Sequence, residues 1–451
     1  MEDFRLIADE IAASIAAGRL RPGEQLPTQR AFARRRRIAP STAARVYAEL
    51  VRRSLVVGEV GRGTFVRAGG DASLRGVPLA EPAAARVDLE LNYPVVPEQA
   101  EVLGSALAPM LRTDALDAAL RPVGARGTPT ARRAFASLVA SGADGGAAWQ
   151  PAEDEVLFAG NGRQAIAASL AALVPPGRRL GVEELTYPVV KAIAQRLGIT
   201  LVPLPTDEHG LLPDALGAVH RATPLNAVYA QPRLHNPLGT SLAPERREAL
   251  AAALRTLDLT LVEDAVWSFL QPAVPPLAAL APERTIVVDS LSKRLAPGLS
   301  TGFLVVPDAL RAAVGASLRS TGGNPSGFAL EAAVRWIGDG TVSAIGAAKR
   351  ADAVQRQALA RRILAGQRLL ADTCSYYTWW HLPPQWRAET FVAAAAREGI
   401  ALTPGAAFAV GPGASPSAVR IGLASPPLPV LERALRLLGE LADAAPEDLL
   451  G

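Results

Sequence analysis

The sequence predicts a small helical domain with a β-hairpin, followed by a large α/β domain. The first part contains three apolar-periodic segments and then two strand-like runs joined by a Gly-Arg-Gly turn. Residues 67–88 are rich in Gly, Ala and Pro and lack periodicity, as flexible linkers do. Beyond them, short apolar runs alternate with helical patterns, which is typical of an α/β sheet. We therefore place the domains at 1–67 and 88–451, with a linker at 68–87.

Composition indicates the class of protein. A chain of 451 residues is too long for one ordinary core, and 49% hydrophobic residues suffice for two or three. No apolar run has membrane-spanning length, and the acidic start "MEDFRLIADEIAAS" lacks the layout of a signal peptide. The single cysteine, Cys374, excludes an internal disulfide framework, and four scattered histidines argue against a metal site. We expect a soluble cytoplasmic protein without a membrane partner.

The net charge of +4 is unevenly distributed. Residues 1–70 hold 13 Arg and 7 Asp or Glu, so the basic excess lies at the front. It includes the run "RRRR" at 34–37, which by itself fits either a solvated helix face or a surface that contacts a polyanion.

The front domain resolves into three helices and a hairpin. A second helix at 29–36 is capped by Thr28, and a third begins at Pro40 and reaches about Arg53. The segment "LVVGEVGRGTFV" predicts two strands and their turn. The first helix ends at Gly18 and has its apolar residues at helical spacing, at Phe4, Ile7, Ile11 and Ile15. Helix, helix-turn-helix and wing together are typical of a DNA-binding layout.

Three words in this region carry a resemblance: "GRLRPGEQLPTQR", "TAARVYAEL" and "GRGTFV". The segment resembles the winged-helix domain of GntR-family bacterial repressors, and departs from it at Ala39, where that family often has a Ser cap. Ser and Thr hydroxyls suit phosphate contacts, and arginine can pair with guanine. Thr42 fits a purely structural role as well. The resemblance implies that these residues face DNA: Arg30, Ser41, Thr42, Arg45, Arg62 and Gly63.

In the large domain, polar residues follow several strand-like runs. "VLFAG" leads into Asn161, "TLVE" into Asp264, and "TIVVD" into Ser290. Ligands gather at the carboxyl ends of strands in a parallel sheet, which is the sheet that this alternation predicts. Taken singly, each residue also fits an ordinary turn or cap.

Lysine is rare in this chain, with 44 of its 47 cationic residues being arginine, yet Lys293 stands within "SLSKRLAPGL". That word, and the order of the strand-end residues, resemble fold-type I aminotransferases over roughly residues 88–445. The resemblance implies a large PLP-dependent transferase domain with a smaller C-terminal α+β subdomain, and pyridoxal 5′-phosphate (PLP) as cofactor. It makes Lys293 the internal aldimine residue, because a Schiff base needs a primary amine that arginine lacks.

Further roles follow from the same resemblance. Asp264 matches the carboxylate that pairs with the pyridinium nitrogen, and Tyr187 matches the aromatic residue stacked on the ring. Asn236 in "HNPLG" matches the side chain that bonds the phenolic oxygen. Arg420 in "VRIGLA" matches the guanidinium that holds the α-carboxylate of an amino acid.

The phosphate end of PLP is assigned in the same way. Gly162 and Arg163 match the helix start that surrounds the phosphate, where backbone N–H groups suit an anion. Ser290 and Ser292 match hydroxyls that flank the lysine, Ser290 being the phosphate contact.

Two positions depart from the family pattern. Ser300 stands where relatives usually have an arginine for the phosphate. Trp267 stands where they often have a tyrosine near the phenolic oxygen, and an indole can donate a hydrogen bond but not accept one. The departures favour PLP binding, with Trp267 at the cofactor, over efficient transamination.

A GntR-type head joined to an aminotransferase-like body resembles the MocR subfamily of bacterial regulators. This implies a homodimeric, head-to-tail regulator that binds promoter DNA and senses a small amino compound by forming an external aldimine. Such a protein is cytoplasmic, and nucleoid-associated when bound to DNA. Two alternatives stay open: a working aminotransferase with a DNA-binding head, which Ser300 and Trp267 oppose, and a body that only dimerises, which Lys293 and Asp264 oppose.

Overall fold

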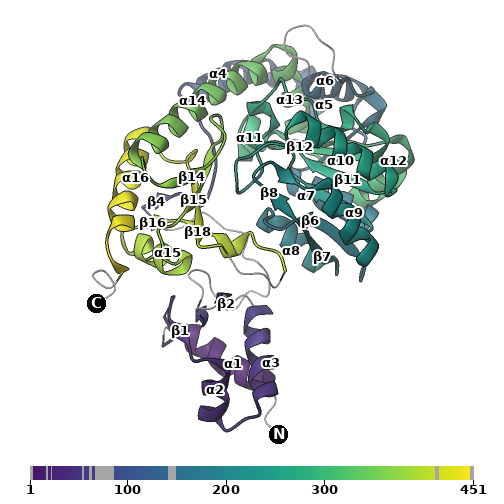
Figure 1. The fold of residues 1–451 in the computed structure, drawn as a ribbon. Coiled ribbons are helices and arrows are strands. Elements are labelled where there is room, and N and C mark those ends of the chain that lie inside the picture. The colour runs from purple at the N-terminus through teal and green to yellow at the C-terminus, as the bar shows by residue number, and fades with distance from the viewer. Residues whose placement is uncertain are drawn as a thin grey trace.

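The computed structural model comprises a small head and a large body (Figure 1). None of the described helices combines the length and apolar character that crossing a bilayer requires. The residues that the structure describes are 4–16, 19–21, 23–52, 55–59, 63–66, 86–140, 149–411 and 416–446.

The head has the three helices and the hairpin that the sequence predicts, with one additional strand. The helices are α1 (Phe4–Ala16), α2 (Gln29–Arg36) and α3 (Pro40–Arg52). The strands β2 (Val56–Glu59) and β3 (Gly63–Val66) form the wing, and β1 (Gln25–Leu26) pairs with β3 on its other side. Two residues are too few to leave a period-two pattern, which is why β1 is not evident in the sequence. Gly18 and Arg53 lie outside the described residues.

The body is built on a sheet of seven strands in the order β5-β13-β12-β11-β10-β6-β7. The prediction of a parallel sheet is wrong for one strand, because β13 runs antiparallel to both of its neighbours. The chain folds back over residues 291–301 and returns beside β12, since a parallel return needs a longer crossover. The strands are β5 (Val156–Ala159), β6 (Arg179–Glu183), β7 (Thr200–Leu204), β10 (Ala227–Ala230), β11 (Thr260–Asp264), β12 (Thr285–Ser290) and β13 (Gly302–Val305).

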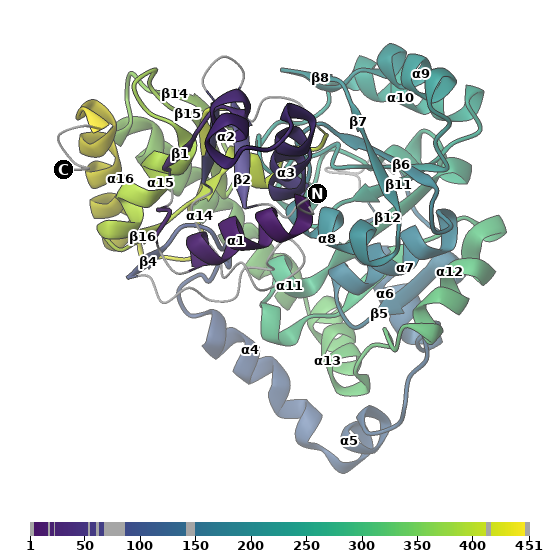
Figure 2. The same cartoon turned by 90° about the horizontal axis from the view of Figure 1, so that it is seen from below.

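Helices cover both faces of this sheet (Figure 2). On one face, α7 (Gly162–Leu173), α8 (Pro188–Arg196) and α12 (Asp308–Ser320) contribute to one buried apolar cluster. On the other face, α9 (Pro213–Ala222) and α10 (Pro244–Thr256) contribute to a second. Helices therefore cover both faces of the sheet, which leaves the strand ends as the place where a ligand can approach. The helices at the far edge are α4 (Gln99–Leu107), α5 (Thr113–Ala119), α6 (Pro129–Val139) and α13 (Gly327–Gly338).

The C-terminal part of the body is a separate α+β layer. Its four-stranded sheet has the order β14-β15-β18-β17. A two-stranded parallel pair joins β4 (Val87–Asp88) to β16 (Ile400–Ala401), so the segment that enters the body is tied to this layer. The elements are β14 (Arg368–Leu370), β15 (Tyr377–His381), β17 (Thr403–Pro404) and β18 (Ala418–Gly422), with α14 (Thr341–Ile363), α15 (Ala388–Arg397) and α16 (Leu428–Asp443).

Candidate functional site: a cavity at the strand ends

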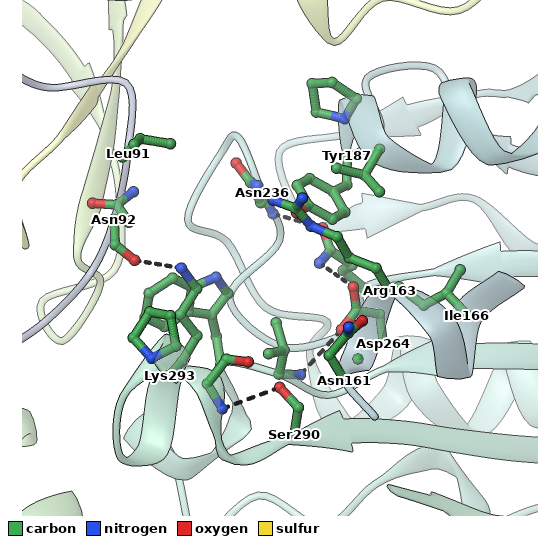
Figure 3. A pocket seen from close by; sticks show the side chains of 18 of the residues that line it. Leu91, Asn92, Asn161, Arg163, Ile166, Tyr187, Asn236, Asp264, Ser290 and Lys293 are labelled. Carbon is green, nitrogen blue, oxygen red and sulfur yellow. Dashed lines mark hydrogen bonds between the residues drawn. The ribbon is translucent and has the colours of Figure 1, made fainter. Parts of the chain in front are cut away.

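A cavity of about 740 Å³ lies between the large sheet and the C-terminal layer. Its lining comes from the ends of β11 and β12, from the start of α7, and from β17 and β18. The segment 90–93, at the entry to the body, closes one side. Figure 3 shows the close-up. The structure brings all the residues proposed for PLP and ligand to this cavity: Gly162, Arg163, Tyr187, Asn236, Asp264, Trp267, Ser290, Ser292, Lys293 and Arg420.

Lys293 lies in the single turn of α11 (Leu291–Arg294), directly after β12. Its Nζ donates a hydrogen bond to the carbonyl oxygen of Asn92, as Figure 3 shows. Two aromatic rings flank the amine, with ring centroids 4.4 Å away for Tyr93 and 5.2 Å away for Trp267. Burial lowers the pKa of Lys293 to about 7, and the nearby positive charges of Arg420 and Arg163 add to the effect. The amine is therefore partly neutral, and nucleophilic, at neutral pH.

The other two lysines have different surroundings. Lys349 in α14 is buried and does not line the cavity; its Nζ donates to the carbonyl oxygens of Lys293 at 3.0 Å and Leu295 at 2.5 Å. It thereby holds the turn that carries Lys293. Lys191 in α8 lines the cavity, and its Nζ donates to the carbonyl oxygens of Ala407 and Ala409.

Asp264 is the last residue of β11 and is 3% exposed. Tyr229 donates to its Oδ2 from the hydroxyl at 2.7 Å, and Gln231 donates from Nε2 at 3.0 Å. The backbone N–H of Val266 donates to Oδ1 at 3.1 Å. Burial raises the pKa of Asp264 to about 6, while these hydrogen bonds act in the opposite direction. A buried carboxylate in this state favours a cationic partner in the cavity.

Arg163 and Tyr187 lie side by side at the cavity (Figure 3). Burial raises the pKa of the Tyr187 hydroxyl, and the adjacent Arg163 guanidinium opposes that rise. Arg163 stands in the first turn of α7 and its side chain is exposed.

An array of donors surrounds the α7 N-terminus. Asn161 caps this helix by accepting from the backbone N–H of Gln164 at 3.0 Å. A Cβ on Gly162 would lie 3.3 Å from the side chain of Ser290, a tight contact, so glycine leaves the most room at the helix start. Beside it, the Ser292 and Ser300 hydroxyls are 2.5 Å apart. Backbone N–H groups and hydroxyls in this arrangement suit an anion.

Arg420 faces the cavity from β18 and is 8% exposed. Its Nη1 donates to Asn236 Oδ1 at 3.1 Å, and its Nη2 donates to Thr403 Oγ1 at 3.1 Å and to the carbonyl oxygen of Glu90. Within the described residues, its buried Nε has no hydrogen-bond partner. A guanidinium with an unused buried donor favours an anionic ligand.

These residues fit PLP. The open α7 N-terminus and the serine hydroxyls suit the phosphate, Asp264 suits the ring nitrogen, and Lys293 suits the aldehyde carbon. Groups of three or more His, Cys, Asp or Glu side chains able to hold a metal ion do not occur in the described part of the chain.

The sequence reasoning missed several residues at the site. Asn92 and Tyr93 contact Lys293, but they follow the linker and no strand of the large sheet. The sequence contains no pattern that could have indicated them, because only tertiary folding brings together residues about 200 positions apart. Gln231 and Tyr229 hold Asp264, and here a signal exists. Gln231 comes directly after β10, where the strand-end argument applies.

On the head, the residues proposed for DNA lie near one another along the chain. Arg30, Ser41 and Arg45 are exposed and Thr42 is half-buried. The Arg45 guanidinium carbon is 4.1 Å from the Phe4 ring centroid. Gly63 has φ +121°, a backbone conformation that favours glycine. Arg62 lies outside the described residues.

Comparison with known proteins finds two families along the chain. Residues 105–438 match the family aminotransferase class I and II, and residues 5–66 match the bacterial regulatory proteins of the gntR family. The uncharacterized HTH-type transcriptional regulator YdeF of Bacillus subtilis (strain 168) is 29% identical over 98% of this chain and 94% of its own length. The HTH-type pyridoxine biosynthesis transcriptional regulator PdxR of Corynebacterium glutamicum is 29% identical over 71% of this chain and 69% of its own.

Solved structures resemble the body. An archaeal alanine:glyoxylate aminotransferase has a TM-score of 0.71 at 20% identity, over 79% of this chain and 90% of its own. LysN, the α-aminoadipate aminotransferase of Thermus thermophilus, complexed with N-(5'-phosphopyridoxyl)-L-leucine, has a TM-score of 0.69 at 23% identity, over 81% of this chain and 92% of its own. At these identities the likeness establishes the fold of the body.

Proposed function

The chain belongs to the aminotransferase class I and II family and joins it to a gntR-type head in the MocR architecture, and from this premise we propose that it binds promoter DNA and senses a small amino compound in the Lys293 cavity. It is a transcription regulator with a PLP-dependent aminotransferase-like domain. The observation that supports sensing is the joint placement of Lys293, Asp264 and Arg420 around one cavity.

Each residue has a distinct part in this proposal. When bound, PLP supplies an aldehyde that takes up primary amines and a ring that acts as an electron sink. Lys293 would hold the aldehyde end of the cofactor, for which a primary amine with a pKa near 7 is suited. Asp264 keeps the ring nitrogen protonated, and Arg420 binds a carboxylate of the effector through its unused donor.

The remaining PLP contacts form two groups. Tyr187 and Asn236 would hold the ring of the cofactor, with Trp267 beside Lys293. Ser290, Ser292 and the α7 N-terminus at Gly162 hold the phosphate. The exposed Arg30, Ser41 and Arg45 of the head contact DNA, and two such heads in a homodimer read two half-sites.

Absorbance of the protein loaded with PLP tests the sensing half. Wild type should show the band of a lysine-bound cofactor, and borohydride should fix the cofactor to Lys293. Lys293→Ala should lose both while the fold, followed by circular dichroism, stays intact. Lys191→Ala is the matched control, because Lys191 lines the same cavity but is bonded to carbonyl oxygens. A band that persists in Lys293→Ala would show that the cofactor is attached elsewhere.

A working aminotransferase with a DNA-binding head is the second candidate. The near-neutral pKa of Lys293 and the buried Asp264 favour it, because a group that transfers protons works best with a pKa near the working pH. Ser300 and Trp267 oppose it. Repeated turnover of an amino acid with a 2-oxo acid would establish this candidate. Binding of an amino acid without turnover would instead support the regulator.

A further inference from the structure

The Lys293 amine lies in a small site of its own, on the side of the cavity that residues 90–93 close (Figure 3). The carbonyl oxygen of Asn92 accepts a hydrogen bond from Nζ, and the rings of Tyr93 and Trp267 have their centroids 4.4 and 5.2 Å from it. A carbonyl oxygen and the faces of aromatic rings carry partial negative charge, so all three favour a cation over a neutral amine. The arrangement therefore suits an ammonium group.

The wall that residues 90–93 provide is held by the residues just after β18. Ser425 Oγ donates to the carbonyl oxygen of Leu91 at 2.8 Å and accepts from the N–H of Tyr93 at 3.1 Å. The side chain of Asn92 accepts from the backbone N–H of Ala424 at 3.3 Å. The Asn92 carbonyl and the Tyr93 ring are therefore held in place by contacts other than those with the amine.

Trp267 is also held without the amine. The side chain is 5% exposed, and its ring packs with those of Phe269, Tyr376 and Tyr377 at centroid distances of 6.3, 6.0 and 5.7 Å. Of the aromatic side chains, the indole attracts a cation most strongly. Tryptophan at this position therefore favours the ammonium form more than the tyrosine of the family pattern would.

Positive charge elsewhere in the cavity opposes this preference. The pKa of Lys293 is lowered to about 7, first by burial and then by Arg420 on β18, Arg163 on α7 and Lys349 on α14. About half of the amines are then protonated at pH 7, so contacts that favour the cation decide which form prevails. The other charged side chains that line the cavity are Glu90, Lys191, Asp264 and Asp289.

We propose that the Asn92 carbonyl, Tyr93 and Trp267 form a resting site that holds the Lys293 amine as an ammonium group whenever the amine is not attached to PLP. The existence of the resting site does not depend on the proposed function, whereas its consequence for sensing does. An aminotransferase needs a group that moves a proton at the bound amino acid, and a released lysine can do so only as a neutral amine. The ammonium form is not a base, so the cavity can bind an amino compound without converting it.

NMR of the lysine side chains tests the resting site, because the chain has three lysines. Full-length protein labelled with ¹³C at lysine Cε and freed of PLP is titrated with pH, and Lys293→Ala and Lys191→Ala assign the resonances. Tyr93→Leu keeps the site apolar but removes one ring face, and the attraction of such a ring corresponds to a pKa change of roughly 0.5 to 1. We expect the pKa of Lys293 to fall by that amount, and Trp267→Leu to act in the same direction.

Tyr93→Phe is the matched variant, because it keeps the ring and should keep the pKa of Lys293. Lys349 is the internal control: burial lowers its pKa to about 7 as well, but its Nζ donates to the carbonyl oxygens of Lys293 and Leu295, so its pKa should stay the same. A ring that only excluded water would give the opposite sign, since hydration returns the pKa toward its ordinary value of about 10.4. An unchanged or raised pKa of Lys293 in Tyr93→Leu, or a fall in Tyr93→Phe, would overturn the resting site.

The rate at which PLP attaches gives a second readout. At pH 6 the neutral fraction of the amine limits this rate, so Tyr93→Leu should attach PLP roughly three to ten times faster than the parent. A slower rate in a variant with the parent's circular dichroism would overturn the proposal. The NMR titration involves neither PLP nor effector nor DNA, so the resting site and the proposed function can fail independently.

Discussion

At the scale of single residues, Lys293 is a buried amine in the cavity with a lowered pKa. Its amine contacts a carbonyl oxygen and two aromatic rings, while Arg420 and Arg163 are close enough to oppose its positive charge. Burial is the largest cause of its low pKa. A lysine in this environment differs from a surface lysine in reactivity as well as in position.

This difference predicts a pH dependence for attachment of PLP. Only the neutral amine attacks an aldehyde, so the rate of attachment should rise with pH and level off above about 7, the pKa of Lys293. An ordinary lysine, with a pKa near about 10.4, would give a rate that rises across the whole range from about pH 6 to 9. Stopped-flow absorbance after mixing cofactor-free protein with PLP measures the rate. A rise without a plateau would contradict the lowered pKa.

We predict that Arg163 supplies the positive charge at the PLP phosphate that relatives usually supply from the position of Ser300. Ser300 cannot supply a positive charge and bonds to Ser292, whereas Arg163 stands in the first turn of α7, whose N-terminus suits the phosphate. A hydrogen bond to an ionised group contributes about 1.5–3 kcal/mol, so Arg163→Gln should raise the dissociation constant of PLP at least severalfold. Adding Ser300→Arg should recover most of the loss.

Equilibrium titration of PLP into both variants measures this. Arg178→Gln is a matched control, because Arg178 is exposed and does not line the cavity. If Arg163→Gln binds PLP as tightly as the parent, Arg163 faces solvent and the exchange does not occur.

At the scale of elements, helix starts recur where an anion is expected. α7 begins at the cavity with Gly162 exposing its N-terminus, and α3 begins on the head at Pro40. A helix N-terminus favours negative charge, which suits a cofactor phosphate in the first case and a DNA phosphate in the second. In the proposed function, α3 and the wing are two separate elements that contact DNA.

We expect Arg45 in α3 and Arg62, which the sequence assigns to the turn between the wing strands, to act differently. Loss of a base contact at Arg45 should cost roughly 1–3 kcal/mol and relax sequence preference. Loss of a phosphate contact at Arg62 should weaken all sequences and flatten the dependence on salt. The Arg45 guanidinium lies on the Phe4 ring, so Arg45→Ala also needs a melting curve to exclude damage to the head. Titrations of both variants at several salt concentrations decide between these outcomes, and unchanged binding would remove the assignment.

At the scale of the whole molecule, the cavity that contains Lys293 belongs to no single layer. Its floor is the edge of the large sheet, its opposite wall is β17 and β18, and residues 90–93 close the side. The β4–β16 pair ties the segment that leads from the linker to the C-terminal layer. The C-terminal layer therefore contacts the cavity, the entry segment and the wing.

Much of this protein follows from local sequence patterns. The helices of the head and the strand-helix alternation of the body depend on periodicity and on turn residues, which act over a few positions. The rarity of lysine and the polar residues at strand ends indicated Lys293, Asp264 and Ser290, because a shared sheet edge brings strand ends together.

Tertiary structure alone decided the rest. The reversed direction of β13 depends on how the chain returns beside β12. Asn92 and Tyr93 reach Lys293 across about half the chain, and Val57 and Phe65 become buried only because another layer covers them. Such contacts leave no periodic trace, since neither partner constrains the residues adjacent to it in sequence. Packing between distant segments sets these contacts, and with them the low pKa of Lys293.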